Sequence, residues 1–131
     1  MNPIVELREK LTRHPELRFV ETSRSIEVEA PSEQGFAVSL YASPPSYTVH
    51  FEGWHEDFES PEQALNCFAF AFSGECRLAV TYRGRFPVKW VLEHLREGRW
   101  YPESEVGLLL VSFWRSARVV YRQNPNLLAA A

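Results

Sequence analysis

The hydrophobic pattern of this chain is densest in one segment near its middle. All residues from Ala64 to Phe72 are apolar except Asn66. Ser60 stands before this segment, where its hydroxyl can cap a helix, and Gly74 follows it, where a left-handed residue can end one. A surface helix shows one apolar stripe, whereas a helix that is apolar nearly all round is buried. The pattern therefore predicts a central helix over 61–73 that is covered on more than one side.

A second helix is predicted near the N-terminus, over residues 3–13. Ile4, Leu7 and Leu11 recur at helical spacing, and Asn2 can cap the first turn. The sequence His14-Pro15 should end this helix, because a proline disfavours helical geometry at the residue before it. We expect this helix to pack outside the rest of the domain.

Alternating apolar and polar positions predict strands in most of the remaining chain. These strands are expected in the ranges 16–30 (two short strands), 36–43, 47–53, 76–82, 99–101, 108–114 and 118–122. The range 88–96 fits a helical stripe as well as a strand. The strand is favoured there because its tryptophan and valines suit a strand and an aromatic strand follows the glycine at 98 at once.

Short connections between successive strands make them antiparallel. The predicted fold is therefore a single α+β domain over 1–131. It is expected to be a curved antiparallel sheet of about eight or nine strands around the central helix. Asn124-Pro125-Asn126 is expected to end the ordered domain, and the residues after it are expected to fray.

Composition is that of an ordinary globular chain, with 45% hydrophobic and 24% charged residues. The sequence offers no transmembrane candidate and no visible signal peptide, so no membrane partner and a cytoplasmic location are expected. Cys67 and Cys76 do not suggest a disulfide framework. A cysteine inside the predicted central helix is expected to be a small buried apolar residue in a reducing compartment.

Charge is unevenly divided along the chain. Residues 1–66 hold five Lys/Arg against twelve Asp/Glu, a net −7, and residues 67–131 hold nine against five, a net +4. In the second half Arg83 and Arg85 lie beside aromatic residues, and Arg99 precedes Trp100. Rings and guanidinium groups on a sheet can bind single-stranded nucleic acid. The overall charge of −3 nevertheless makes a nucleic-acid partner unexpected.

Candidate ligand-binding side chains gather just before the central helix. His50, Glu52 and His55 could supply nitrogen and oxygen ligands, and the first two are expected on one strand face. Their spacing matches no established metal motif, so neither a metal nor a cofactor is expected. His94 is a further candidate, although its neighbour Glu93 should point to the opposite face of a strand.

The sequence contains no glycine-rich phosphate loop, nucleophile elbow or paired-cysteine zinc motif, and it identifies no catalytic residue. Tryptophan, tyrosine and arginine are enriched in protein interfaces, which makes Trp90 and Trp100 candidate anchors. The expected function is a non-catalytic protein-interaction module, either a homodimer or a binder of another protein. The alternative is a small-molecule-binding protein or small enzyme, with a cavity between helix and sheet lined by residues such as His50 and His94.

Overall fold

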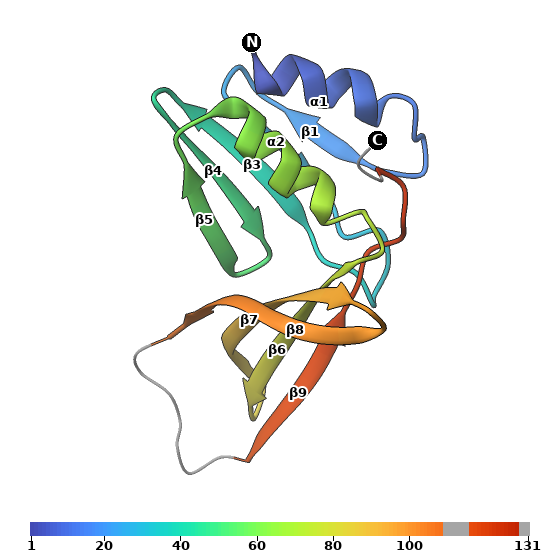
Figure 1. The fold of residues 1–131 in the computed structure, drawn as a ribbon, viewed down its shortest axis with the longest axis vertical. Helices are drawn as coiled ribbons and strands as arrows, with labels where there is room; N and C mark the ends of the chain where they lie inside the picture. The colour runs from blue at the N-terminus through green and yellow to red at the C-terminus, as the bar shows by residue number, and fades with distance from the viewer. Residues whose placement is uncertain (109–115, 129–131) are drawn as a thin grey trace.

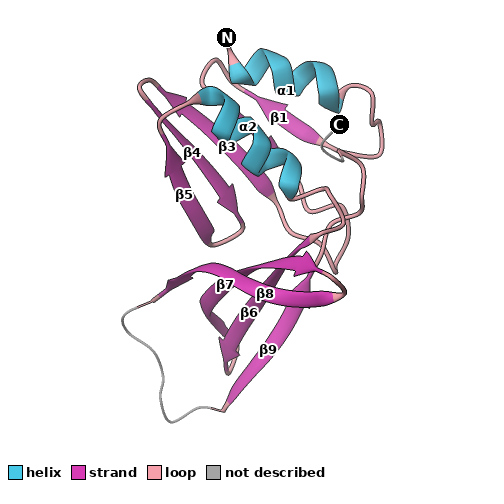
Figure 2. Ribbon diagram, in the orientation of Figure 1, coloured by secondary structure: helices cyan, strands magenta, loops and turns pink. Residues whose placement is uncertain are grey.

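The computed structural model describes residues 1–108 and 116–128, which form two helices and nine strands (Figures 1 and 2). The helices are α1 (Pro3–Leu11) and α2 (Pro61–Phe70). The strands are β1 (Phe19–Glu21), β2 (Ser25–Val28), β3 (Val38–Ser43), β4 (Ser46–Phe51), β5 (Trp54–Phe58), β6 (Cys76–Arg83), β7 (Phe86–Arg96), β8 (Arg99–Gly107) and β9 (Ala117–Arg122). None of the helices in these residues is long and apolar enough to cross a membrane.

The α+β class and the antiparallel pairing predicted from the sequence are confirmed, but the single sheet is wrong. The first sheet has the order β1-β2-β3-β4-β5, and the second sheet has the order β8-β7-β6-β9. Helix α2 and the turn after it stand between β5 and β6, and β6 pairs with β7 and β9 instead of returning to β5. Alternation along a strand predicts its two faces and says nothing about which strands become neighbours.

Helix α2 lies beside α1 on one face of the first sheet, with the second sheet below them (Figure 1). It ends at Phe70, three residues before the predicted end, and residues 71–74 form turns. Ala64, Leu65 and Phe68 are buried, whereas Asn66 is exposed and Phe70 is half-buried. The expected sheet wrapped around this helix is therefore not observed, because one side of α2 faces an open cleft.

Ser60 caps α2 as its sequence predicts. Its hydroxyl accepts a hydrogen bond from the backbone N–H of Gln63 at 3.1 Å. Replacing Ser60 by Ala removes this acceptor, and we expect the free energy of unfolding to fall by about 1 kcal/mol with no change of fold. Chemical denaturation measures this change, and an unaltered midpoint would show that the cap contributes nothing.

The ambiguous range 88–96 is a strand, as favoured from the sequence, and it belongs to β7. Strand β8 is longer than the predicted 99–101, and β5 was not predicted at all. From Leu109 onward, the predicted strand 108–114 lies outside the described residues.

The buried side chains of both sheets and both helices form one continuous cluster. Leu127 and Leu128 pack in this core, which corrects the expectation that the ordered domain ends at Asn124-Pro125-Asn126. The side chain of Asn124 is buried, accepts from the N–H of Phe36 at 2.9 Å and donates to the carbonyl of Phe36 at 3.1 Å. Leu128 is also buried, and its N–H bonds to the carbonyl of Phe72 at 3.1 Å.

Candidate functional site

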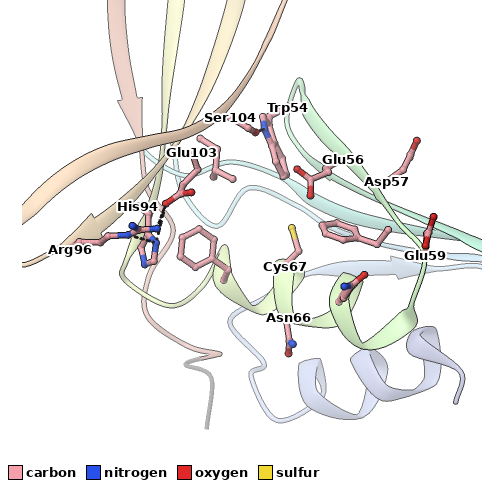
Figure 3. Close-up of a pocket in the computed structure, with 14 residues that line it drawn as sticks. Trp54, Glu56, Asp57, Glu59, Asn66, Cys67, His94, Arg96, Glu103 and Ser104 are labelled. Carbon is pink, nitrogen blue, oxygen red and sulfur yellow. Dashed lines mark hydrogen bonds and ion pairs between the residues drawn. The ribbon is translucent and has the colours of Figure 1, made fainter.

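A cleft of about 840 Å³ lies where α2, β5 and the β7–β8 hairpin meet (Figure 3). Strand β5 and the residue after it supply one wall, and one stripe of α2 supplies another. The lining residues are Trp54, Glu56, Asp57, Phe58, Glu59, Gln63, Asn66, Cys67, Phe70, Leu92, His94, Arg96, Glu103 and Ser104. Apolar and aromatic side chains thus share the cleft with three carboxylates, whereas the side chain of Asp57 turns away and bonds to Thr48. Such a mixture is suited to orienting a bound group.

The two sheets are joined across one end of this cleft. The indole Nε1–H of Trp54 on β5 donates a hydrogen bond to the hydroxyl of Ser104 on β8 at 2.6 Å (Figure 3). Trp54 is almost fully buried and packs against Phe51, with 4.8 Å between ring centroids. The indole therefore fixes this end of the cleft, and the opposite end opens beside Glu59.

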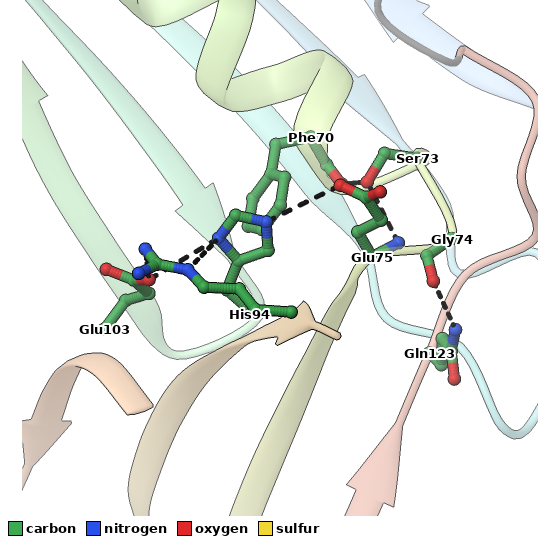
Figure 4. A network of polar contacts seen from close by, with 8 residues as sticks. Phe70, Ser73, Gly74, Glu75, His94, Glu103 and Gln123 are labelled. Atoms are coloured by element: carbon green, nitrogen blue, oxygen red, sulfur yellow. Dashed lines mark hydrogen bonds and ion pairs between the residues drawn. The ribbon is translucent and has the colours of Figure 1, made fainter. Parts of the chain in front are cut away.

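His94 lies at the edge of the cleft among charged groups from three segments (Figure 4). Its Nε2 is 3.5 Å from a carboxylate oxygen of Glu75, and its Nδ1 is 3.5 Å from Glu103. Arg96 donates from Nε to the same Nδ1 at 3.3 Å and also pairs with Glu103. The ring packs edge-on against Phe70, with 4.9 Å between centroids. His94 therefore lies in a cleft between helix and sheet, the kind of site suggested for it in the sequence analysis. Its neighbour Glu93 points to the opposite face of the strand and pairs with Arg77.

Both cysteines are free, and neither is an activated thiolate. Burial, assisted by the carboxylate of Glu56, raises the pKa of Cys67 to about 12. Burial also raises the pKa of Cys76, with a smaller contribution from Cys67. A thiol reacts as a nucleophile only in its thiolate form, and both thiols are protonated at neutral pH. We therefore do not expect either cysteine to act as a nucleophile.

His50 and His55 lie elsewhere, on the face of the first sheet that points away from the helices. They are cross-strand partners with 5.3 Å between ring centroids, and Tyr41 packs against His50. Partial burial, together with the neighbouring His55, lowers the pKa of His50, and Asp57 opposes this. Within residues 1–108 and 116–128 no three histidine, cysteine or acidic side chains are placed to hold a metal ion.

Glu52 does not converge with His50, because it occupies the β4–β5 turn with φ 56° and leaves the strand face. Its carboxylate accepts from the indole Nε1–H of Trp90 at 2.8 Å and lies 3.5 Å from Nε of Arg122. A Cβ at the adjacent Gly53 would stand 2.3 Å from the Trp90 ring, so the turn fits only with glycine there. The candidates Glu52 and Trp90 therefore join the two sheets, and Trp90 is buried.

Arg83 and Arg85 lie at the β6–β7 turn, and Trp100 is at the start of β8. The ring of Trp100 faces Arg77, whose guanidinium carbon is 4.5 Å from the Trp100 ring centroid and 4.0 Å from the Tyr121 ring centroid. The structure therefore groups Trp100 with Arg77 and Tyr121 instead of with Arg83 and Arg85.

Trp100 belongs to the face of the second sheet that points away from the core, which we name the outer face. Its members share one side of the register, opposite the buried Leu78, Val80 and Leu92. Its apolar members are Ala79, Val91, Leu95, Trp100, Val119 and Tyr121, and its polar and charged members are Arg77, Thr81, Lys89, Glu93 and Glu105. Val119 is 49% exposed and Tyr121 is 53% exposed.

Sequence reasoning missed most of the residues that make these two surfaces. Glu56 and Glu59 belong to β5 and the residue after it, a strand that the sequence analysis did not predict. Glu103 reaches the cleft at an irregularity in the β7–β8 register, which no local pattern signals. Val119 and Tyr121 share one face of the predicted strand 118–122, but the sequence could not show that they are exposed.

No protein-family model, curated protein or solved structure matches this chain. The functional argument therefore rests on its own surfaces.

Proposed function

We propose that this protein is a non-catalytic protein-interaction module that forms a homodimer through the outer face of its second sheet. The observation that supports this proposal is a difference in polarity between the outward faces of the two sheets. An antiparallel sheet with one solvated face normally places polar residues on that face. The first sheet follows this rule, since its outward rows are Val20-Glu27-Ser39-His50-His55 and Ser25-Tyr41-Thr48-Asp57. The outer face of the second sheet departs from it with six apolar members.

The charges on the outer face favour a second copy as the occupant. Arg77 pairs with Glu93, and Lys89 lies 3.6 Å from Glu105, so the face neutralises its own charges. A strongly basic or acidic partner finds no complement there. A second neutral apolar face can pack on it without repulsion, even though each chain carries −3. Two-fold homodimers are also the commonest closed assembly.

The size of the face predicts a weak dimer. Four strands spaced about 4.8 Å apart, each roughly 20–30 Å long, offer roughly 400–550 Å² on each copy. The total of about 1,000 Å² is at the lower limit for a specific interface. We therefore expect association that depends on concentration and, because it is apolar, changes little with salt.

The exposed valines on the two edge strands provide a matched test. Val119→Asp places a charge on the outer face, in β9, and Val20→Asp does the same on the first sheet, in β1, where Val20 is 63% exposed. In sedimentation velocity we expect Val119→Asp to shift the protein to monomer. We expect Val20→Asp to leave the proportions of monomer and dimer the same as in the unsubstituted protein. Equal behaviour of the two variants would overturn the proposed interface.

The alternative function, a ligand-binding protein or small enzyme, draws its support from the cleft. His94 lines that cleft together with Arg96 and the carboxylates of Glu56, Glu59 and Glu103, and His50 does not. The cleft is open to solvent instead of closed around its contents, which suits an extended ligand better than an enclosed small molecule.

A further inference from the structure

The wall of the cleft formed by β5 is the edge of the first sheet. Strand β5 pairs with β4 on one side only. A two-residue turn joins Phe51 to Trp54, and the residues flanking such a turn form a hydrogen-bonded pair, with bonded and non-bonded pairs alternating beyond it. His55 and Asp57 are therefore the residues whose backbone N–H and C=O groups point away from β4. In residues 1–108 and 116–128, no backbone group bonds to them from outside the strand pair.

The opposite wall is a single stripe of α2. Gln63, Cys67 and Phe70 recur at helical spacing along it, with Asn66 beside them. Ten residues of helix extend about 15 Å, which matches four or five residues of extended chain. A cleft with a strand edge on one side and a helix on the other is one that an extended peptide can enter as an added strand.

The charge of the cleft restricts which peptide fits. Three carboxylates, those of Glu56, Glu59 and Glu103, line it against one permanent cation among the lining residues, Arg96, and Arg96 already pairs with Glu103. Within the described part of the chain, Glu56 and Glu59 have no ion-pair partner. Phe58 follows Glu56 by two residues and adds its ring to the cleft, and Phe70 adds a second ring beside His94. Carboxylates and aromatic rings together attract ammonium and guanidinium groups that carry apolar stems.

We propose that this cleft binds an extended segment of a partner protein that carries lysine or arginine side chains and pairs with β5. The backbone groups of His55 and Asp57 bond to the segment, and its basic side chains lie against Glu56 and Glu59. This site is separate from the outer face of the second sheet and does not rest on self-association. In such strand addition the main chain contributes affinity and alternate side chains contribute specificity.

The test titrates synthetic six-residue peptides into the intact protein and measures their affinities by calorimetry. The probe alternates lysine and valine. The first control replaces each lysine by glutamate, and the second keeps the lysines but carries methyl groups on alternate backbone nitrogens. We expect each control to bind at least tenfold more weakly, the first through charge and the second through lost backbone donors. Equal affinity of all three peptides, or no binding of the lysine peptide, would overturn the proposal.

Protein variants and amide exchange locate the binding. We expect Glu56→Gln with Glu59→Gln to weaken the lysine peptide about tenfold, and Glu27→Gln, on the outward row of the first sheet, to leave its affinity unchanged. Saturating peptide should slow hydrogen exchange at the amides of His55 and Asp57. Unchanged exchange at both amides would contradict strand addition. Free lysine or spermidine binding as tightly as the peptide would identify a small cation as the ligand and also overturn the proposal.

Discussion

Replacing Phe68 by Ala is expected to lower the free energy of unfolding by about 3–5 kcal/mol, the largest effect of any substitution considered. Phe68 is fully buried on the side of α2 that faces the first sheet, and its ring centroid is 6.1 Å from that of Phe72. Truncation removes the ring from the shared core and leaves a cavity, because neighbouring strands and α1 relax only partly. Chemical denaturation at one fixed protein concentration measures the loss.

Phe86→Ala is the matched control for this change. Phe86 is 59% exposed in β7, so the same truncation there should cost less than about 1 kcal/mol. A loss below about 1 kcal/mol for Phe68→Ala as well would mean that α2 does not pack on the sheet as described.

Replacing Asn124 by Ala is expected to cost about 2–4 kcal/mol. The side chain satisfies both the N–H and the carbonyl of Phe36, and all of these groups are buried. Each buried polar group left without a partner costs about 1–3 kcal/mol, so losing both bonds together is expensive. The segment after β9 would also lose its attachment to the first sheet.

The nearby Asn126→Ala separates this effect from a general disturbance of the C-terminal segment. Asn126 is exposed, and we expect its truncation to change stability by no more than about 0.5 kcal/mol. Equal denaturation midpoints for the two variants would show that the segment does not anchor to Phe36.

The parts of the fold predicted correctly from sequence are those encoded locally. The cap at Ser60 and the alternation in β4 and β7 follow from neighbouring residues, and the structure confirms them. The division into two sheets arises because the second neighbour of β6 is β9 and not β5. Strand β9 lies about forty residues further along the chain, so no local pattern predicts this pairing. Asn124 shows the same limit, since its partner is Phe36 and nothing beside it in the sequence indicates burial.

The candidate sites show the same difference between features encoded locally and contacts made by distant segments. His94 reached the cleft as proposed because one strand face placed it there, but its neighbours Glu75 and Glu103 come from other segments. Glu52 was assigned to the face of His50 by simple alternation, and the tight turn at Gly53 redirected it toward Trp90. The rings of Tyr121 and Trp100 both contact Arg77 only because β9 pairs with β6 and β8 pairs with β7. The sequence alone does not reveal these strand pairings, so it did not predict the outer face of the second sheet.

Sedimentation equilibrium of the unchanged chain, over a wide concentration series at low and at high salt, tests the proposed homodimer most directly. We expect a reversible monomer–dimer equilibrium whose dissociation constant changes little with salt, because the outer face is apolar and its charges are paired internally. A monomer at every concentration and salt would contradict the account, and so would a dimer that dissociates as salt rises.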